Sequence, residues 1–249
     1  MGWPRDDAKL NRVRALMAEE GLDALVVRAP DNVVYLTNFW AMKGYEAVVF
    51  PREGEPTLVC LEASAEDAER TAWTADVRYL RGYADDDPRP PFARTVELAA
   101  EAARDQGTVG LELSLGTQAS DRMVGEPTTF THDWFHAFGT EVADATPLLA
   151  RARALKTEQE LDRMRLANEI AAAAMEHCRE HLEPGMKESE AGALWNGFVH
   201  GEGTGWEGRV ELALGFSLVW SGPGIKTFTA TGDLPVQENE PTLFRSPNA

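Results

Sequence analysis

The sequence predicts an α/β protein: a mixed sheet with helices on its faces, followed by a smaller α+β part. Three observations support this fold class. Short apolar runs alternate with amphipathic helical patterns over residues 6–138, as in a sheet covered by helices. The longest helical pattern, 157–182, comes after them. The last segment, 211–244, contains apolar runs interrupted by turn residues.

The elements of the first part follow from hydrophobic spacing and from the turn residues between them. Amphipathic spacing predicts helices at 6–20, 64–73, 92–105 and 131–138. We expect Ser64 to cap the second of these helices and Thr131 the fourth. Apolar runs predict strands at 22–28, 33–39, 45–51, 57–61, 77–83 and 109–113.

The second part begins with two helices. The helix at 157–182 ends at Glu183-Pro184-Gly185, and a second helix is predicted at 189–200. Residues 150–153, just before the pair, carry few core residues. We therefore place a domain boundary near residue 153, which gives domains 1–153 and 154–249.

The last segment predicts strands separated by turns, with a short β-branched and aromatic piece at 227–231 between the first apolar run and the last. The apolar run 212–220 meets Ser221-Gly222-Pro223-Gly224, where the chain must turn. A final apolar strand starts at 241–244, five residues before the chain stops at Ala249. Because such a strand needs partners, we interpret the second domain as incomplete.

Charge and composition exclude several functions. The net charge of −17 argues against nucleic acid or an anionic membrane as a partner. No apolar run approaches the roughly 20 residues of a membrane helix, and the first residues lack the apolar core of a secretory signal. We therefore predict a cytoplasmic protein. Cys60 and Cys178 have no CxxC neighbour and are predicted to be reduced core thiols.

Two histidine pairs have a spacing that metal ligands can use. His177 and His181 belong to an H-x-x-E-H pattern, which on a helix serves zinc proteases if a third ligand exists. We favour the alternative, a polar flank at the end of an amphipathic helix. His132 and His136 are predicted to lie at the surface or the core edge.

Six segments carry a resemblance to a known family. They are 22–27 (LDALVV), 32–39 (NVVYLTNF), 49–56 (VFPREGEP), 154–167 (ALKTEQELDRMRLA), 182–190 (LEPGMKESE) and 221–244. Together they resemble the creatinase and aminopeptidase P family of metallohydrolases, which have the pita-bread fold. The resemblance implies a creatinase-type N-terminal domain and an incomplete pita-bread domain.

The resemblance also implies chemistry and partners. Relatives hold two divalent metal ions with Asp, Asp, His, Glu and Glu, and a metal-activated water attacks an amide or amidine carbon. Their substrates are peptides or small amides. They form homodimers in which the N-terminal domain of one subunit helps to close the site of the other.

The sequence departs from the family pattern at the expected ligands. Arg245 stands where an acid is expected. The family often has a histidine after the Ser-Gly-Pro turn, and the nearest equivalent in this sequence is Thr229. The segment with the remaining ligands is missing. A guanidinium has a permanent charge and no acceptor, so it cannot hold a cation. We therefore predict no catalytic residue, no metal ligand and no cofactor in this chain.

The binding candidates are three aromatic residues and Thr229. Phe39, Trp40 and Trp220 could line a substrate pocket, although buried packing is the commoner role of such residues. We predict a truncated, inactive member of the Xaa-Pro aminopeptidase and creatinase metallohydrolase lineage. The alternative is a non-catalytic binding or dimerisation module. A hydrolase whose metal ligands are not recognisable in the sequence is the third possibility.

Overall fold

The computed structural model describes residues 3–40, 45–113, 130–139, 142–215, 217–223, 225 and 230–245. The chain divides into two compact units, Gly2–Thr157 and Glu158–Ala249. We call them the N-terminal unit and the C-terminal unit and describe each by itself. The division falls at Thr157, a few residues beyond the boundary predicted near 153.

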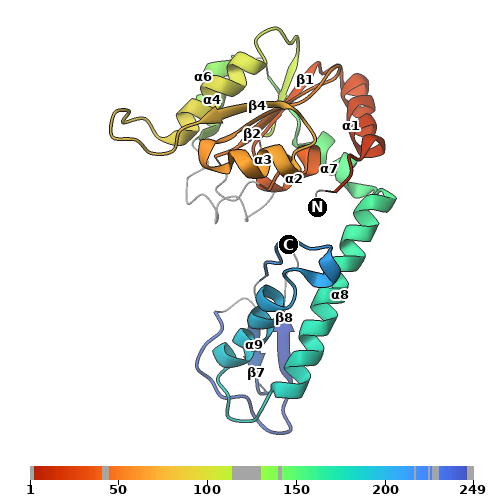
Figure 1. The fold of residues 1–249 in the computed structure, drawn as a ribbon, viewed down its shortest axis with the longest axis vertical. Helices are drawn as coiled ribbons and strands as arrows, with labels where there is room; N and C mark the ends of the chain where they lie inside the picture. Colours follow the sequence, from red (N-terminus) through yellow and green to blue (C-terminus); the bar gives the residue numbers. More distant parts are fainter. Residues whose placement is uncertain are drawn as a thin grey trace. The chain divides into compact units, whose positions relative to one another are not determined.

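The N-terminal unit contains one six-stranded mixed sheet with strand order β4-β3-β2-β1-β5-β6 (Figure 1). Strand β1 is antiparallel to β2 and parallel to β5, and the outer pairs β3–β4 and β5–β6 are parallel. The elements of this unit are α1 (Asp7–Glu20), β1 (Ala24–Val27), α2 (Pro30–Thr37), β2 (Ala47–Pro51), β3 (Thr57–Leu61), the 3-10 helix η1 (Glu62–Ser64), α3 (Ala65–Thr71), β4 (Asp76–Leu80), α4 (Pro91–Ala102), β5 (Val109–Leu111), α6 (Phe130–Phe138), β6 (Ala143–Asp144) and α7 (Thr146–Ala154). The predicted mixed sheet with helices is confirmed.

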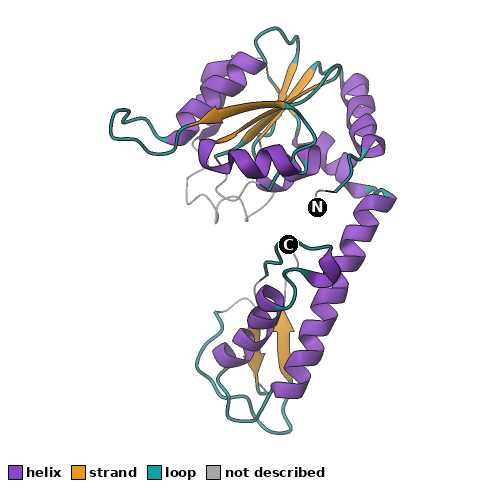
Figure 2. Cartoon of the chain, viewed as in Figure 1, coloured by secondary structure: helices purple, strands orange, loops and turns teal. Residues whose placement is uncertain are grey.

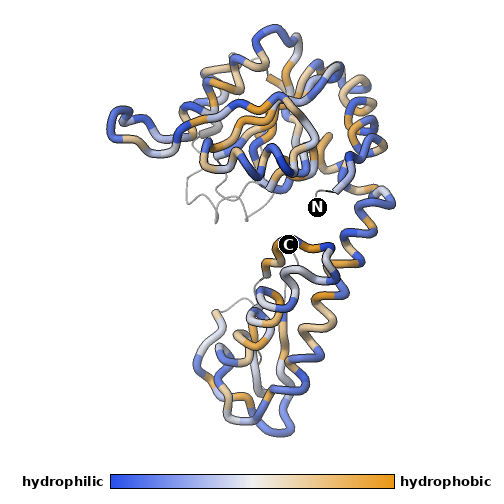
Figure 3. The backbone as a smooth tube through the Cα atoms, viewed as in Figure 1, coloured by the Kyte–Doolittle hydropathy of each residue, from blue (hydrophilic) through white to orange (hydrophobic). Residues whose placement is uncertain are grey.

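Helices cover both faces of this sheet (Figure 2). Along β1, Leu25 and Val27 belong to a core shared with α1, α2, α3 and α7, whereas Ala24 and Val26 belong to a second core shared with α4 and α6. Because successive side chains of a strand point to opposite faces, both sets become buried. This explains why the strands read as continuous apolar runs, which Figure 3 shows as hydrophobic stretches at the centre of the unit.

The strand predicted at 33–39 is wrong: these residues lie in helix α2 and just beyond it. Pro30 occupies the first turn of α2, where its missing N–H costs nothing. The backbone N–H of Ala29, the residue before the helix, donates to Glu112 Oε2 at 2.8 Å. Asn38 ends the helix in the left-handed conformation. A partner some 80 residues away in the chain therefore helps to start a helix in a segment rich in β-branched residues.

Two predicted caps are also wrong. Ser64 lies before α3 as predicted, but its side chain makes no capping hydrogen bond, because residues 62–64 form the 3-10 turn η1. Thr131 is the second residue of α6 rather than a residue before it.

Helix α7 belongs to the sheet unit, although only Ala152 is buried among residues 150–153, where few core residues were expected. Leu148, Leu149 and Ala152 are buried in the same core as α1 and α2. In addition, the Tyr35 hydroxyl donates to the carbonyl of Ala152 at 3.1 Å. The sheet unit therefore continues to the end of this helix.

The C-terminal unit combines a helix pair with a two-stranded sheet. Its elements are α8 (Glu158–His181), α9 (Glu188–Gly201), the 3-10 helix η2 (Trp206–Gly208), β7 (Leu218–Ser221) and β8 (Thr242–Arg245). Both predicted helices and the last strand are confirmed. Strands β7 and β8 are antiparallel, with Val219 opposite Phe244 and Trp220 opposite Leu243.

The core of the C-terminal unit lies between α8, α9 and the loop that precedes β7. Trp195 of α9 packs with Ile170, Ala174 and Cys178 of α8. Gly215 approaches this indole so closely that a Cβ there would lie 2.8 Å from two ring carbons. The cysteine prediction is confirmed, because Cys60 and Cys178 are both buried and free. None of the helices in the described ranges has the length and apolar character needed to span a membrane.

Candidate functional site

Phe39 and Trp40 follow helix α2 and have different environments. The Asn38 side-chain amide donates to the carbonyl of Thr71 at 2.9 Å, which fixes the turn. Beyond this turn Phe39 is 2% exposed and packs in the core, whereas Trp40 is 40% exposed. Of the two predicted binding residues in this unit, Trp40 is the one accessible to a ligand.

The other two predicted binding residues belong to the C-terminal unit. Trp220 lies on β7 and is 3% exposed, so its side chain is buried. Thr229 lies outside the residues that the structure describes. Substrate binding by these aromatic residues and Thr229 stays a prediction.

The H-x-x-E-H histidines stack on each other at the end of α8. Their ring centroids are 4.1 Å apart, and the His177 ring also lies 5.2 Å from that of Phe198. Nδ1 of His181 lies 2.8 Å from the carbonyl oxygen of His177, so this nitrogen must carry the hydrogen and donate. The arrangement fits a stacked pair on an aromatic neighbour, as the polar-flank interpretation expects. Of the second pair, His136 is exposed, and the side chain of His132 lies outside the described part.

The possible metal ligands in the described part do not fit the two metal ions that the family resemblance implies. Within the described ranges, no three His, Cys, Asp or Glu side chains come together as a metal-binding group. Arg245 stands at the end of β8, opposite Leu218, and its side chain is exposed. Two divalent ions need several carboxylates to balance their charge, so we derive no metal-dependent step from these residues.

Glu188 is a site residue that the sequence patterns did not indicate. It begins α9 and is 3% exposed. One of its carboxylate oxygens accepts from the N–H of Ser221 at 2.9 Å, and the other accepts from the N–H of Gly232 at 3.1 Å. Glu188 therefore fixes the Ser221 turn against α9. The only sequence hint was an acidic residue at the start of a helix, which normally indicates no more than a favourable interaction with the helix dipole.

Glu112 has a similar position in the N-terminal unit and was also missed. It follows β5, is 5% exposed and accepts hydrogen bonds from the N–H groups of Arg28 and Ala29 at 3.0 and 2.8 Å. It also accepts one from the Asn32 side chain. Arg153 of α7 donates to the same Asn32 at 3.0 Å. This polar network joins β1, α2, β5 and α7.

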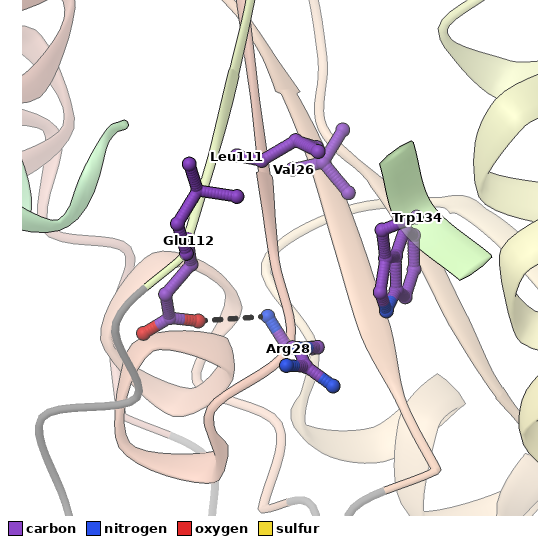
Figure 4. Close-up of a pocket in the computed structure, with 6 residues that line it drawn as sticks. Val26, Arg28, Leu111, Glu112 and Trp134 are labelled. Atoms are coloured by element: carbon purple, nitrogen blue, oxygen red, sulfur yellow. Dashed lines mark hydrogen bonds between the residues drawn. The ribbon is translucent and has the colours of Figure 1, made fainter. Parts of the chain in front are cut away.

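A pocket opens beside Glu112 (Figure 4). Its cavity volume is about 10 Å³, which is close to the minimum that holds a single water molecule. The residues that line it come from β1, β5 and α6 and are Val26, Arg28, Leu111, Glu112, Leu113 and Trp134. None of the three predicted aromatic residues, Phe39, Trp40 and Trp220, lines it.

Comparison with known proteins identifies the family. Residues 9–155 match the family model described as Creatinase/Prolidase N-terminal domain. This match covers more than half of the chain and almost all of the N-terminal unit. The chain therefore belongs to the creatinase and prolidase family, and the resemblance inferred from the sequence is confirmed.

Curated relatives include two named hydrolases. An ectoine hydrolase from Halomonas elongata is 29% identical over 192 residues, which are 73% of this chain and 45% of that protein. An Xaa-Pro dipeptidase from Lactobacillus delbrueckii subsp. lactis is 27% identical over 185 residues, which are 72% of this chain and 46% of that protein. The matches thus span about half the length of these relatives.

Solved structures share the fold. The prolidase from Pyrococcus horikoshii OT3 has a TM-score of 0.68 at 18% identity. The match covers 94% of this chain and 58% of that one. An X-Pro aminopeptidase from Thermotoga maritima MSB8 has a TM-score of 0.64 at 17% identity, with 92% of this chain and 59% of that one covered. The predicted creatinase-type and pita-bread architecture is therefore confirmed.

Proposed function

We propose that this chain belongs to a hydrolase that cleaves an amide bond in a peptide or a small amide, and that residues 1–249 alone do not catalyse this reaction. The observation that carries the proposal is the contrast between the fold and the metal ligands that the described residues offer. The fold and family are those of Xaa-Pro peptidases and creatinases. The described residues, however, contain no cluster that could hold a metal ion, and an arginine ends β8.

The substrate class follows from the relatives in a general way only. One is named a hydrolase of ectoine and another a dipeptidase of Xaa-Pro substrates. A dipeptidase hydrolyses an amide bond, and the other name states that ectoine is hydrolysed. Because one fold supports many substrates, we extend to this chain the bond type and not a particular substrate.

A homodimer supports this function better than a monomer. In the family that the sequence resembles, the N-terminal domain of one subunit helps to close the site of another. Trp40 is the predicted binding residue with an accessible side chain, and such a large aromatic group suits an intersubunit contact. We propose a cytoplasmic dimer in which Trp40 meets the ligand or the partner.

The test compares the chain with an extended version. In the extended protein, Arg245→Asp is introduced, and the part of the L. delbrueckii dipeptidase that continues past the matched region is appended. We expect residues 1–249 to hold well under one Mn²⁺, Zn²⁺ or Co²⁺ per chain after dialysis and to cleave no Xaa-Pro dipeptide. The extended protein should bind metal and cleave, because its carboxylates come from several strands of a completed sheet.

A matched variant keeps Arg245 in the extended protein. We expect it to lose most metal and activity, since a guanidinium cannot replace a ligand. Stoichiometric metal and turnover in residues 1–249 would refute the proposed inactivity. A folded, metal-loaded extended protein that cleaves neither an Xaa-Pro dipeptide nor a small cyclic amide would refute the proposed reaction.

A further inference from the structure

Helix α8 ends on two adjacent imidazoles that the proposed hydrolase does not use. His177 and His181 are one helical turn apart, so their side chains are neighbours on the same side of the helix. Their ring centroids lie 4.1 Å apart and the ring planes are inclined by 30°. Two nitrogen ligands of one zinc-like ion, each about 2.0–2.1 Å from it, are separated by a similar distance. The two rings are therefore close enough for one ion to bridge them.

A hydrogen bond selects the form of His181 that can bind a metal. Its Nδ1 donates to the carbonyl oxygen of His177 at 2.8 Å. In the neutral ring the lone pair is then on Nε2. Metal-binding histidines normally make such a bond with their second nitrogen, because it fixes the tautomer and the orientation of the ring. His181 is thus arranged as an Nε2 ligand, and it is exposed to solvent.

His177 also packs against α9, where its ring centroid lies 5.2 Å from that of Phe198. A coordinated ion lies in the plane of each imidazole that binds it, so two stacked rings must turn toward each other to share one ion. The torsion that joins an imidazole to Cβ is broad, which makes this rotation inexpensive. The helix therefore supplies the spacing of the two ligands, and only a ring rotation remains for chelation.

The electrostatic surroundings of the pair favour a cation. The C-terminal end of a helix carries a partial negative charge, and His181 is the last residue of α8. Arg179 is a nearby cation, but its guanidinium donates to the Glu176 carboxylate at 2.9 Å, which offsets its charge. The net charge of −17 also raises the concentration of cations near the surface of the chain.

The type and number of ligands determine which ion fits. Imidazole nitrogen suits Zn²⁺, Ni²⁺ and Cu²⁺, whereas Mg²⁺ and Ca²⁺ prefer oxygen ligands. In the part of the chain that the structure describes, no third His, Cys, Asp or Glu joins the pair to make a larger metal-binding group. Water must therefore fill the other coordination positions of a bound ion. Among divalent ions of the first transition row, such a site binds Cu²⁺ most tightly.

We propose that His177 and His181 form a two-histidine chelate for a divalent ion late in the first transition row, with Cu²⁺ bound most tightly. The site lies within one helix of the C-terminal unit and is separate from the hydrolase proposed above. Two protein ligands leave the ion exchangeable, so dialysis should remove it. Because the folded helix holds the two ligands side by side, a bound ion should stabilise the fold of this unit.

The test uses the full chain with the metal ions alone as probes, near neutral pH in a buffer that does not bind metal. Calorimetric titration with Cu²⁺ should show one site per chain with a dissociation constant on the order of 10 µM. Zn²⁺ should bind at least about tenfold more weakly. Mg²⁺ in about hundredfold excess should not compete. With Zn²⁺, the ring resonances of His177 and His181 should shift with one shared dissociation constant.

Single-histidine variants locate the site. His181→Ala and His177→Ala should each weaken Cu²⁺ binding at least about tenfold, because one imidazole remains and chelation is lost. His200→Ala removes an exposed histidine of α9 in the same unit and should leave the binding constant unchanged. Saturating Zn²⁺ should raise the melting temperature of the parent chain and not that of His181→Ala. Since His181 is exposed, its replacement should leave the fold intact.

Several outcomes would overturn the proposal. One is no saturable binding at about 1 mM Cu²⁺, a concentration far above the expected dissociation constant. Others are unchanged affinity in folded His181→Ala, equal losses in the His181 and His200 variants, or several ions bound with equal affinity, which would indicate adventitious binding only. Competition by Mg²⁺ would mean that carboxylates hold the ion. None of these measurements involves turnover, so failure of this site is distinguishable from failure of the proposed hydrolase.

Discussion

The two units of this chain reach a folded state with very different amounts of buried surface. In the N-terminal unit, six strands are covered on both faces, and two extensive cores result. In the C-terminal unit, two strands pack with α9, and its cores are small. Large apolar side chains also remain exposed there, among them Leu234 at 60% and Leu212 at 52%. Since stability grows with buried apolar area, we expect the N-terminal unit to be the more stable.

The units share one device in spite of this difference. Each uses a buried glutamate to hold two backbone N–H groups at a point where the chain changes direction. Glu112 holds those of Arg28 and Ala29, and Glu188 holds those of Ser221 and Gly232. A charged acceptor satisfies buried N–H groups more strongly than a neutral one. The two units are therefore alike in using a buried carboxylate to hold the backbone, and they differ in how much apolar surface they bury.

The largest expected effect comes from dividing the chain. A fragment of residues 1–157 should fold cooperatively, because its sheet and both cores are complete. A fragment of residues 1–145 should not, because it loses Leu148, Leu149 and the carbonyl that accepts from Tyr35. Far-ultraviolet circular dichroism and thermal melting of both fragments are the measurements.

The control for this comparison is residues 1–157 with Arg151→Ala, at an exposed position of α7. We expect this variant to melt close to the parent fragment, since exposed ion pairs contribute little. Similar cooperative melting of 1–145 and 1–157 would show that α7 is dispensable, and the N-terminal unit would then end before it.

A smaller effect should distinguish the two cores inside the intact chain. Phe50→Ala in the N-terminal unit and Trp195→Ala in the C-terminal unit each remove a fully packed ring. Each should lower the free energy of unfolding of its own unit by about 3–5 kcal/mol. Denaturant unfolding, followed by hydrogen exchange in each unit, would assign the loss.

Exposed positions provide the matched controls. Tyr83→Ala and Leu234→Ala remove side chains that are 73% and 60% exposed, and they should change unfolding by less than about 0.5 kcal/mol. If Trp195→Ala destabilised both units equally, the chain would unfold as one cooperative body and the comparison would fail.

The sequence predicted most of the fold because burial leaves a local pattern. The strands β1, β2 and β3 and the helices α1, α8 and α9 were all found from apolar spacing and turn residues. Helix α2 was missed because Val33 to Phe39 has the composition of a strand. Glu112 and Asn38 help to fix its two ends, and Glu112 acts across a long sequence separation that no local pattern contains.

The candidate site was less predictable for a related reason. Aromatic residues indicate pockets and cores equally, and the structure places Phe39 and Trp220 among buried residues while Trp40 remains accessible. The pocket at Arg28 and Trp134 was not predicted. Its residues come from three separate segments, and only the strand order β1-β5 brings them together.

The smallest expected effect concerns one thiol in each unit. Burial, with the charge of Glu46 as a lesser cause, raises the pKa of Cys60 from 9.0 to about 12. Burial alone raises the pKa of Cys178 from 9.0 to about 11. A raised pKa in the folded state means that folding favours the protonated thiol. Its contribution to stability is therefore complete below about pH 9 and is lost as the pH rises toward the folded-state pKa.

The loss should continue to a higher pH in the N-terminal unit, to about 12 for Cys60 against about 11 for Cys178. Lysine and tyrosine side chains also titrate there, so the measurement is the difference between the parent chain and Cys60→Ala or Cys178→Ala. Unfolding midpoints at pH 8, 10 and 11 should fall less steeply in each variant, and only for the unit that carries it. Parallel slopes for parent and variant would mean that the thiols ionise without cost in the fold. The decrease in stability of the N-terminal unit at alkaline pH would then not depend on the burial of Cys60.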